Sequence, residues 1–417
     1  MLRQIEGSRA VAEAVALCRP EVVCAYPISP QTHIIEGIGA LVKSGQLEGC
    51  EFINVESEFA AMSVCIGASA AGARSYTATA SQGLLFMIEA VYNASGLGLP
   101  VVMTLANRAI GAPINIWNDH SDAMAVRDAG WVQLFAETNQ EAVDLHVQAF
   151  RLAEELSVPV MVCMDGFVLT HAVEAVEIPT QAQVDAFVPP YEPRQVLDPH
   201  DPVSIGAMVG PEAFEEVRYL AHVKQLEALD RVPEIAAEFA GAFGRPSGGL
   251  VHSYRSEDAE TVVVALGSVL GTIKDTVDDL RERGMRIGVV GIGTFRPFPS
   301  AALRNALGRA RRAVVVEKAL APGAGGILAR DVTMAGAGTA MQTHAVIAGL
   351  GGRPITKTSL TRLFEDAHAG RLDALTFLDL DHGLVDRELA RMAHRRRSGP
   401  IAENVLRDIG VVSARVT

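Results

Sequence analysis

Short apolar runs rich in β-branched residues alternate with helical segments along this chain, and this alternation restricts the fold more than any other feature. Within the first 170 residues, such runs predict strands at 21–25, 50–55, 75–80, 100–106 and 158–164. A helix is predicted before the first strand at 8–17, with Ser8 as its N-cap. Further helices are predicted at 32–43, 57–73, 82–95 and 140–157. Strand–helix alternation is typical of a parallel sheet covered by helices on both faces. We therefore predict an α/β fold.

A chain of 417 residues is too long for one ordinary core, so more than one domain is expected. Residues 1–170 form the first predicted domain. The proline-rich stretch near 190–203, followed by a predicted helix over 211–243, indicates a connecting arm over 171–250. A second α/β domain is predicted over 251–390, beginning with the apolar strand TVVVALGS, and 391–417 is left as a C-terminal tail.

Composition and charge exclude several classes of protein. The net charge of −13 argues against a nucleic-acid partner. None of the five cysteines forms a CxxC pair, so we expect neither a metal site nor an iron–sulfur cluster held by this chain alone. Reduced thiols, the lack of a signal-peptide pattern and the lack of a membrane-spanning apolar stretch lead us to expect a cytoplasmic protein.

Four predicted strands end in polar or proline-rich segments. These segments are Tyr26–Pro30, Asn54–Glu58, Thr79–Gly83 and Asn107–Pro113. Ligands of open parallel sheets bind beyond the carboxyl ends of the strands. Four such ends on one sheet therefore predict a shared binding site.

Two charged residues at these ends are candidates for that site. Glu58 opens an almost entirely apolar helix, so its carboxylate is expected to be half-buried, and a capping role is an equally good interpretation. Glu56 is interpreted as facing solvent. Arg108 is placed to bind a carboxylate in bidentate fashion, or else to form an ion pair with Asp119 or Asp122.

Other motifs have simpler interpretations. The segment NDHSD (118–122) is weak evidence for a metal site, and His120 is expected to be a hydrogen-bonded loop residue. Asp165-Gly166 is interpreted as a turn. No glycine fingerprint of a dinucleotide site follows a first strand in the second half.

Several long strings in the chain match one known family. AYPISPQT, VESEFAAMSVCIGASAAGARSYTATASQGL, NRAIGAPINIWNDHSD and VPVMVCMDGF, followed by FRPFP and GLGGRPIT, resemble the α subunit of 2-oxoacid:ferredoxin oxidoreductases. The resemblance runs in order over about residues 5–360.

The resemblance implies a thiamine diphosphate enzyme. The first domain would be the pyrimidine-type domain, followed by a smaller domain like the C-terminal domain of transketolase. A β subunit would carry the diphosphate site, magnesium and a 4Fe–4S cluster, with γ and ferredoxin-like δ subunits beside it. The reaction would convert a 2-oxoacid and coenzyme A to acyl-CoA, CO2 and two electrons. Ferredoxin would accept them, or NAD where a flavin subunit is added.

The resemblance also implies roles for individual residues. Glu58 would hydrogen-bond N1′ of the aminopyrimidine, which promotes loss of the proton from C2 of the thiazolium. Pro27 and Ser29 would line the cofactor and the substrate. Arg108 would meet the substrate carboxylate, or the charge left after decarboxylation.

Two residues depart from the pattern of the pyruvate enzymes. Ser29 stands where threonine is usual, and Gly111 stands where alanine or serine is usual. Both changes remove volume, so our hypothesis is a substrate bulkier than pyruvate, phenylglyoxylate for example. Pyruvate itself is the alternative. Other readings are a non-catalytic scaffold subunit and a different thiamine enzyme, such as a transketolase-like carboligase or a dehydrogenase E1 component.

Overall fold

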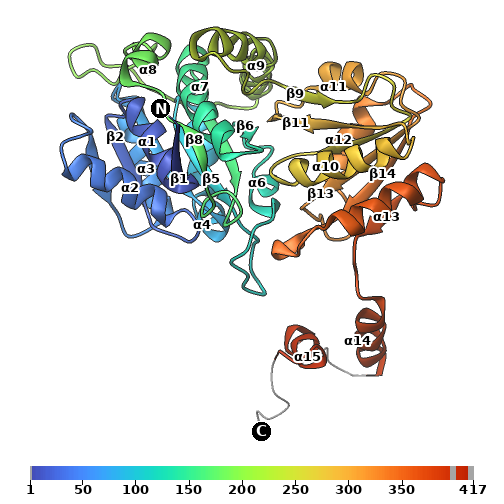
Figure 1. Ribbon diagram of the computed structural model, residues 1–417. Coiled ribbons are helices and arrows are strands. Elements are labelled where there is room, and N and C mark those ends of the chain that lie inside the picture. Colours follow the sequence, from blue (N-terminus) through green and yellow to red (C-terminus); the bar gives the residue numbers. More distant parts are fainter. Residues whose placement is uncertain (1, 395–400, 412–417) are drawn as a thin grey trace.

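Two sheets of mainly parallel strands, each flanked by helices, form two lobes in the computed structural model, which describes residues 2–394 and 401–411 (Figure 1). The first lobe is built around a seven-stranded sheet and the second around a six-stranded sheet. The predicted α/β fold is therefore confirmed. No helix in the described part of the chain is both long and apolar enough to cross a membrane.

The seven-stranded sheet of the first lobe carries the predicted site. Its strands, in spatial order, are β12 (Thr294–Arg296), β6 (Val132–Phe135), β7 (Val160–Asp165), β5 (Val102–Asn107), β4 (Ser75–Thr79), β2 (Val22–Ala25) and β3 (Glu51–Asn54). All neighbours are parallel except β12, which pairs antiparallel with β6. Because the parallel strands all point the same way, the ends of β2, β3, β4, β5 and β7 share one edge.

Helices of the first lobe pack on the sheet through two hydrophobic clusters. One cluster joins α1 (Gly7–Leu17), α2 (Thr32–Lys43) and α7 (Asn139–Leu156). The other joins α3 (Glu58–Ala70), α4 (Ser81–Phe86) and α5 (Ile88–Gly96), and the short α6 (Ser121–Ala125) lies beside them. One detail of the prediction is wrong: α1 starts at Gly7, and Ser8 does not cap it, because its hydroxyl donates to the carbonyl of Thr170.

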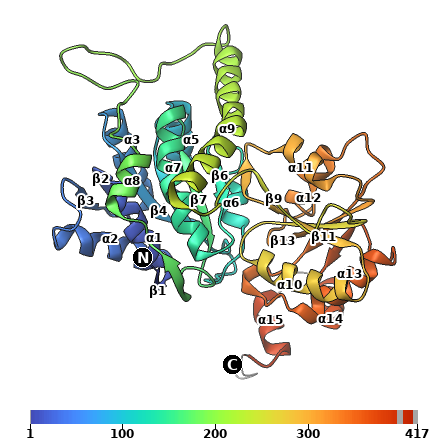
Figure 2. The same ribbon diagram turned by 45° about the horizontal axis from the view of Figure 1, so that its top comes forward.

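The segment that connects the two sheets in the sequence contributes one strand of a two-stranded ribbon and two helices. β1 (Leu2–Glu6) pairs antiparallel with β8 (Val173–Glu177), and α8 (Gln181–Phe187) follows. The predicted long helix is present as α9 (Phe214–Phe243). Figure 2 shows α9 standing beside α7, while the connection from α8 loops away from the sheet.

The second lobe has a six-stranded sheet. In spatial order its strands are β15 (Leu375–Phe377), β14 (Gln342–Ile347), β13 (Arg312–Glu317), β10 (Thr261–Ala265), β11 (Ile287–Ile292) and the antiparallel edge strand β9 (Val251–Tyr254). Its helices are α10 (Val269–Glu282), α11 (Ser300–Leu307), α12 (Leu328–Ala335), the 3-10 turn η1 (Leu350–Gly352) and α13 (Lys357–His368). Helices α14 (His382–His394) and α15 (Ile401–Asp408) lie apart from both sheets (Figure 1).

The two lobes are packed against each other. One hydrophobic cluster contains buried residues of both, including Met62 and Trp131 from the first lobe and Val264 and Val290 from the second. Lys318 of the second lobe donates from its Nζ to the carboxylate of Asp165 in the first lobe at 2.7 Å. The carboxyl edge of the first sheet is therefore held in a fixed relation to the second lobe.

Candidate active site at the strand ends

The structure joins the end of β5 to the end of β2 through Arg108. Its Nη1 donates to the carbonyl of Ser29 at 2.9 Å, and its Nε donates to the carbonyl of Asn115 at 3.2 Å. Ser29 lies in the proline-rich turn after β2, as the sequence predicts. Two of the four predicted strand ends are thus in direct contact.

Asp122 joins the ends of β4 and β5. Its carboxylate accepts the main-chain N–H of Ser81 at 3.0 Å, the main-chain N–H of Arg108 at 2.9 Å and the side-chain amide of Asn107 at 2.9 Å. Burial raises the pKa of Asp122 to about 6, although these hydrogen bonds oppose the rise. The sequence offered Asp122 only as an ion-pair partner, because main-chain donors leave no signature in a sequence.

Glu58 is a buried carboxylate without a partner. It is only 7% exposed, and it makes no hydrogen bond or ion pair with any other residue that the structure describes. It is not the cap of α3: Ser57 is, because its hydroxyl accepts the N–H of Ala60 at 3.2 Å. Buried polar groups normally have partners, so this carboxylate is poised for a ligand.

The carboxylate of Glu58 lies over the end of β4. A Cβ added at Gly83 would lie 2.6 Å from Oε1 of Glu58 and 2.6 Å from the hydroxyl of Thr79. That hydroxyl is buried and lacks a hydrogen-bond partner in the described chain. Glycine at position 83 therefore leaves room for two unsatisfied polar groups beside each other, a composition that suits a hydrogen-bonding ring of a cofactor.

Arg108 is equally buried, at 7% exposed. No carboxylate of a described residue lies within ion-pairing distance of its guanidinium, so the predicted ion pair with Asp119 or Asp122 is absent. Asp119 instead accepts the N–H groups of Ser121 and Gly351. Burial lowers the pKa of Arg108, and the negative charge of Asp122 opposes this. A buried cation without a counter-charge favours an anionic ligand.

The remaining predicted residues surround this edge. Pro27, Ser29 and Glu56 are exposed, in agreement with the interpretation of Glu56 as solvent-facing. A Cβ at Gly111 would lie 2.6 Å from Nε2 of Gln82. The volume that glycine leaves at position 111 is therefore occupied by the Gln82 amide.

The end of β7 forms a buried ionic cluster that joins both lobes. Asp165 is bonded to His120 Nε2 at 2.7 Å, accepts from Lys318 Nζ at 2.7 Å and from the hydroxyl of Ser268. Lys318 follows β13 and Ser268 follows β10, so the carboxyl edges of the two sheets meet here. His120 is hydrogen-bonded as predicted. The predicted turn at Asp165-Gly166 is present, since the N–H of Leu169 donates to the carbonyl of Asp165, but the sequence did not indicate the ionic role of the Asp165 side chain.

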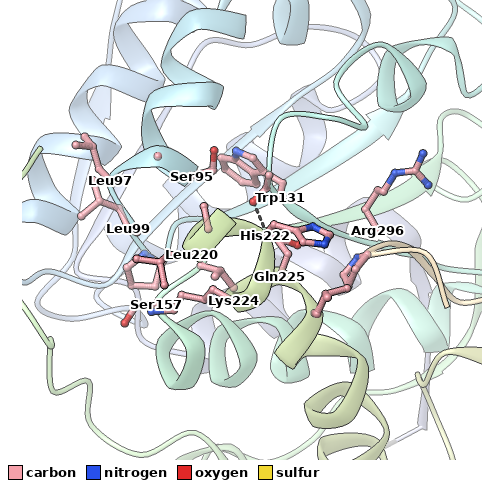
Figure 3. Close-up of a pocket in the computed structure, with 18 of the residues that line it drawn as sticks. Ser95, Leu97, Leu99, Trp131, Ser157, Leu220, His222, Lys224, Gln225 and Arg296 are labelled. Atoms are coloured by element: carbon pink, nitrogen blue, oxygen red, sulfur yellow. Dashed lines mark hydrogen bonds between the residues drawn. The ribbon is translucent and has the colours of Figure 1, made fainter. Parts of the chain in front are cut away.

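A cavity of about 760 Å³ lies elsewhere, between α9 and the first sheet (Figure 3). Its floor comes from segments that precede strands, such as Leu99, Trp131 and Val158, and Gln225 of α9 bonds across it to the carbonyl of Gly130. It therefore opens at the edge of the sheet opposite to Glu58 and Arg108. The strand-end residues, and not this cavity, form the candidate active site.

Comparison with known families defines the class. The family model "Pyruvate flavodoxin/ferredoxin oxidoreductase, thiamine diP-bdg" matches residues 13–240, and the model "Pyruvate:ferredoxin oxidoreductase core domain II" matches residues 259–360. Both domains thus belong to the thiamine diphosphate-dependent oxidoreductases that act on 2-oxoacids.

This chain belongs to the pyruvate flavodoxin/ferredoxin oxidoreductase family and is an α subunit of a 2-oxoacid:ferredoxin oxidoreductase. It is 45% identical over 390 residues to pyruvate synthase subunit PorA of Methanosarcina barkeri, covering 91% of this chain and 97% of the relative. It is 46% identical over 380 residues to PorA of Thermotoga maritima, covering 89% and 95%. Ketoisovalerate oxidoreductase subunit VorA of Pyrococcus abyssi is 38% identical, with 88% and 95% covered.

Solved structures agree on the fold. A 2-oxoglutarate:ferredoxin oxidoreductase from Magnetococcus marinus superposes with a TM-score of 0.70 at 18% identity, covering 88% of this chain and 65% of that one. A split gene transketolase gives a TM-score of 0.51 at 13% identity, with 88% and 99% covered.

Proposed function

We propose that this chain, assembled with partner subunits, catalyses the coenzyme A-dependent oxidative decarboxylation of a 2-oxoacid to acyl-CoA, CO2 and two electrons. The observation that carries this proposal is the pair of buried, unpaired charges at one sheet edge, the carboxylate of Glu58 and the guanidinium of Arg108. Thiamine diphosphate, when bound, would supply the nucleophilic carbon and the electron sink that decarboxylation of a 2-oxoacid needs.

Glu58 holds a proton at the pyrimidine nitrogen. Its carboxylate has no partner in the described chain, and neither has the hydroxyl of Thr79, which also lies next to Gly83. A carboxyl group in a site closed to water shares a proton with a ring nitrogen more readily than one in bulk solvent. Ser57, as the N-cap of α3, fixes the first turn that carries Glu58.

Arg108 binds the carboxylate of the 2-oxoacid. Hydrogen bonds from Nε and Nη1 to two carbonyls fix the orientation of the guanidinium, while Nη2 has no partner in the described chain. A fixed guanidinium binds carboxylates with directional, charge-assisted hydrogen bonds. Asp122 positions the backbone of Arg108 and does not neutralise its side chain. Pro27 and Ser29 line the same site from the end of β2.

A partner subunit covers this edge. Five large apolar side chains around it are exposed, a composition typical of subunit interfaces: Tyr26, Phe59, Ile114, Ile116 and Trp117. We assign the diphosphate site, magnesium and a 4Fe–4S cluster to a β subunit docked here. The γ and ferredoxin-like δ subunits complete the complex, with ferredoxin as the acceptor, or NAD through a flavin subunit.

Pyruvate is the favoured substrate. The relatives at 45% and 46% identity are named pyruvate synthase subunits. Two residues that differ from the pyruvate enzymes suggested a bulkier substrate. Gly111 no longer supports it, because the Gln82 amide occupies the space that the smaller residue leaves. Ser29 still supports a bulkier 2-oxoacid, and phenylglyoxylate is the second candidate.

We propose the division of the chain that the sequence predicts. Residues 1–170 hold the pyrimidine-type domain, 171–250 the connecting arm, 251–390 the C-terminal α/β domain and 391–417 the tail. Strand β12, which lies in the second half of the chain, nevertheless pairs with β6 of the first sheet. The two domains are therefore expected to unfold together.

The test is a comparison of substrates with the assembled complex. The complex is purified under anoxic conditions, and reduction of ferredoxin or methyl viologen is followed with coenzyme A and pyruvate, 2-oxoisovalerate or phenylglyoxylate. We expect the highest kcat/KM with pyruvate. A higher kcat/KM with phenylglyoxylate would identify the aryl 2-oxoacid as the substrate in place of pyruvate. If a complex with all its cofactors bound turned over none of these 2-oxoacids, the chain would be a non-catalytic scaffold subunit.

A further inference from the structure

Three side chains of types that can bind metal ions lie together beside the turn that leads into α2, outside the site described above. They are Glu6 at the end of β1, His33 in the first turn of α2 and His171 in the loop between β7 and β8. One potential ligand atom from each lies within 4.8 Å of the others. None of the three has a role in the proposed reaction.

The backbone fixes Glu6 and His171 relative to each other. Glu6 pairs with Val173 at the end of the β1–β8 ribbon. The N–H of Gly7 donates to the carbonyl of Ala172 at 3.0 Å, and the N–H of Ser8 donates to the carbonyl of Thr170 at 2.9 Å. The segments before and after His171 are therefore bonded directly to the residues that follow Glu6.

His33 enters this group from a third segment. Its Nδ1 lies 2.6 Å from Oε1 of Glu6, and its ring centroid lies 4.8 Å from that of His171. A hydrogen bond between Glu6 and His33 accounts for these two residues alone. It gives no reason for a second imidazole at the same point.

The surroundings of His171 orient its ring. Its Nδ1 lies 2.8 Å from the hydroxyl of Thr170, which also accepts the N–H of Phe167 at 2.7 Å. If Nδ1–H donates to that hydroxyl, the lone pair of Nε2 remains available to a metal. Metal-binding histidines commonly make such an outer hydrogen bond. The ring of Phe167, 4.7 Å away, covers one face of the imidazole.

We propose that Glu6, His33 and His171 bind a divalent transition-metal ion, with Zn²⁺ as the reference case. Two imidazole nitrogens and one carboxylate oxygen form a ligand set that Zn²⁺ accepts and Mg²⁺ does not prefer. All three residues are partly exposed, so the fourth position is open to water or to a partner subunit. The ion would fasten the start of α2, and with it the turn 26–31, to the β1–β8 ribbon.

The test uses the full chain without a polyhistidine tag, stripped of metal by a chelator. Calorimetric titration with ZnCl2 is expected to show one tight site, and Co²⁺ to give the visible absorption of a tetrahedral complex. His33→Ala and His171→Ala should each weaken the tight site by at least tenfold. His222→Ala, on the exposed face of α9, is the matched control and should bind like the parent chain.

A second readout guards against variants that fail to fold. Zn²⁺ should raise the midpoint of thermal unfolding of the parent chain and of His222→Ala, but not that of His33→Ala. The side chain of His33 is 41% exposed, so its removal leaves the core intact. The proposal is overturned if Zn²⁺ binding is absent or survives in His33→Ala, or if Mg²⁺ gives an equal response. None of these readouts depends on turnover, so they stand apart from the proposed function.

Discussion

At the scale of single residues, the site is defined by two charges that the protein buries and leaves unpaired. Glu58 and Arg108 are both 7% exposed, yet neither has an ionic partner in the described chain. Burial of an unpaired charge costs several kcal/mol in general, on the order of 1–3 kcal/mol or more for each unmade hydrogen bond. A protein can retain such an unfavourable buried charge when a bound ligand supplies the missing partner.

Glu58→Gln tests the acid–base role of this carboxylate. The amide keeps the size of the side chain but cannot share a proton with the pyrimidine, so kcat should fall by about 10²–10⁴-fold, the range of a lost general acid–base. Turnover of the assembled complex and its subunit composition are measured together. Glu56→Gln, two residues away and exposed, should keep full activity. Equal activity of both variants would contradict the role of Glu58.

Arg108→Lys tests the binding of the substrate carboxylate. Lysine keeps the charge but cannot reproduce both carbonyl contacts and a directional bond to the carboxylate. We expect KM for the 2-oxoacid to rise by about tenfold or more, while cofactor binding, measured by calorimetry, changes little. An unchanged KM would place the substrate carboxylate elsewhere.

Sequence reasoning located these two residues but not their supports. A strand end followed by a charged residue is visible in the sequence, and the parallel sheet places such ends on one edge. Asp122 escaped detection because its partners are main-chain N–H groups. Asp165 escaped because its partner Lys318 lies 153 residues away.

At the scale of elements, the start of α3 is packed closely against the start of α4. The sequence predicted α3 and the strands before both helices, but it predicted one helix over 82–95 where the structure has two, α4 and α5. It could not predict the space between α3 and α4. That space depends on Gly83, whose missing side chain leaves Glu58 in place.

Gly83→Ala tests this packing. The new Cβ would lie 2.6 Å from Oε1 of Glu58, so the carboxylate must move, and activity should fall by at least tenfold. Gly67→Ala, within α3 and with no atom within 4 Å of the new Cβ, is the matched control. It should keep activity and stabilise the chain by about 0.5–1 kcal/mol. Chemical denaturation and turnover distinguish the two.

At the scale of the whole molecule, the lobes are joined by a buried ion pair and a shared hydrophobic cluster. Lys318→Met would leave the carboxylate of Asp165 without its lysine partner, and the expected loss of stability is about 3–5 kcal/mol. Lys357→Met removes a lysine from an exposed pair with Asp279, so it should lower the stability far less than Lys318→Met does. Urea denaturation measures both. Similar losses in the two variants would contradict the structural role of Asp165.

The ionic cluster around Asp165 predicts how the stability of the protein depends on pH. Burial alone would raise the pKa of Asp165, but the charges of Lys318 and His120 hold it well below its ordinary value. A depressed pKa means that the stabilisation is complete above the unfolded value, about 4, and is lost as the pH falls toward the folded value. The free-energy difference between the parent chain and Asp165→Asn should therefore be constant above about pH 5 and shrink below pH 4. A difference that grows in acid would have the wrong sign.

The way Arg108 is held affects how this molecule can change over time. Both of its protein hydrogen bonds end on carbonyl oxygens of the backbone, at Ser29 and Asn115. Every amino acid brings the same carbonyl, so substitutions at positions 29 and 115 leave the guanidinium where it is. If Arg108 binds the substrate carboxylate as proposed, mutation can therefore change the residues around the substrate while the guanidinium keeps its position. A change of substrate preference would therefore need few substitutions. Each intermediate variant would keep the guanidinium of Arg108 in its position.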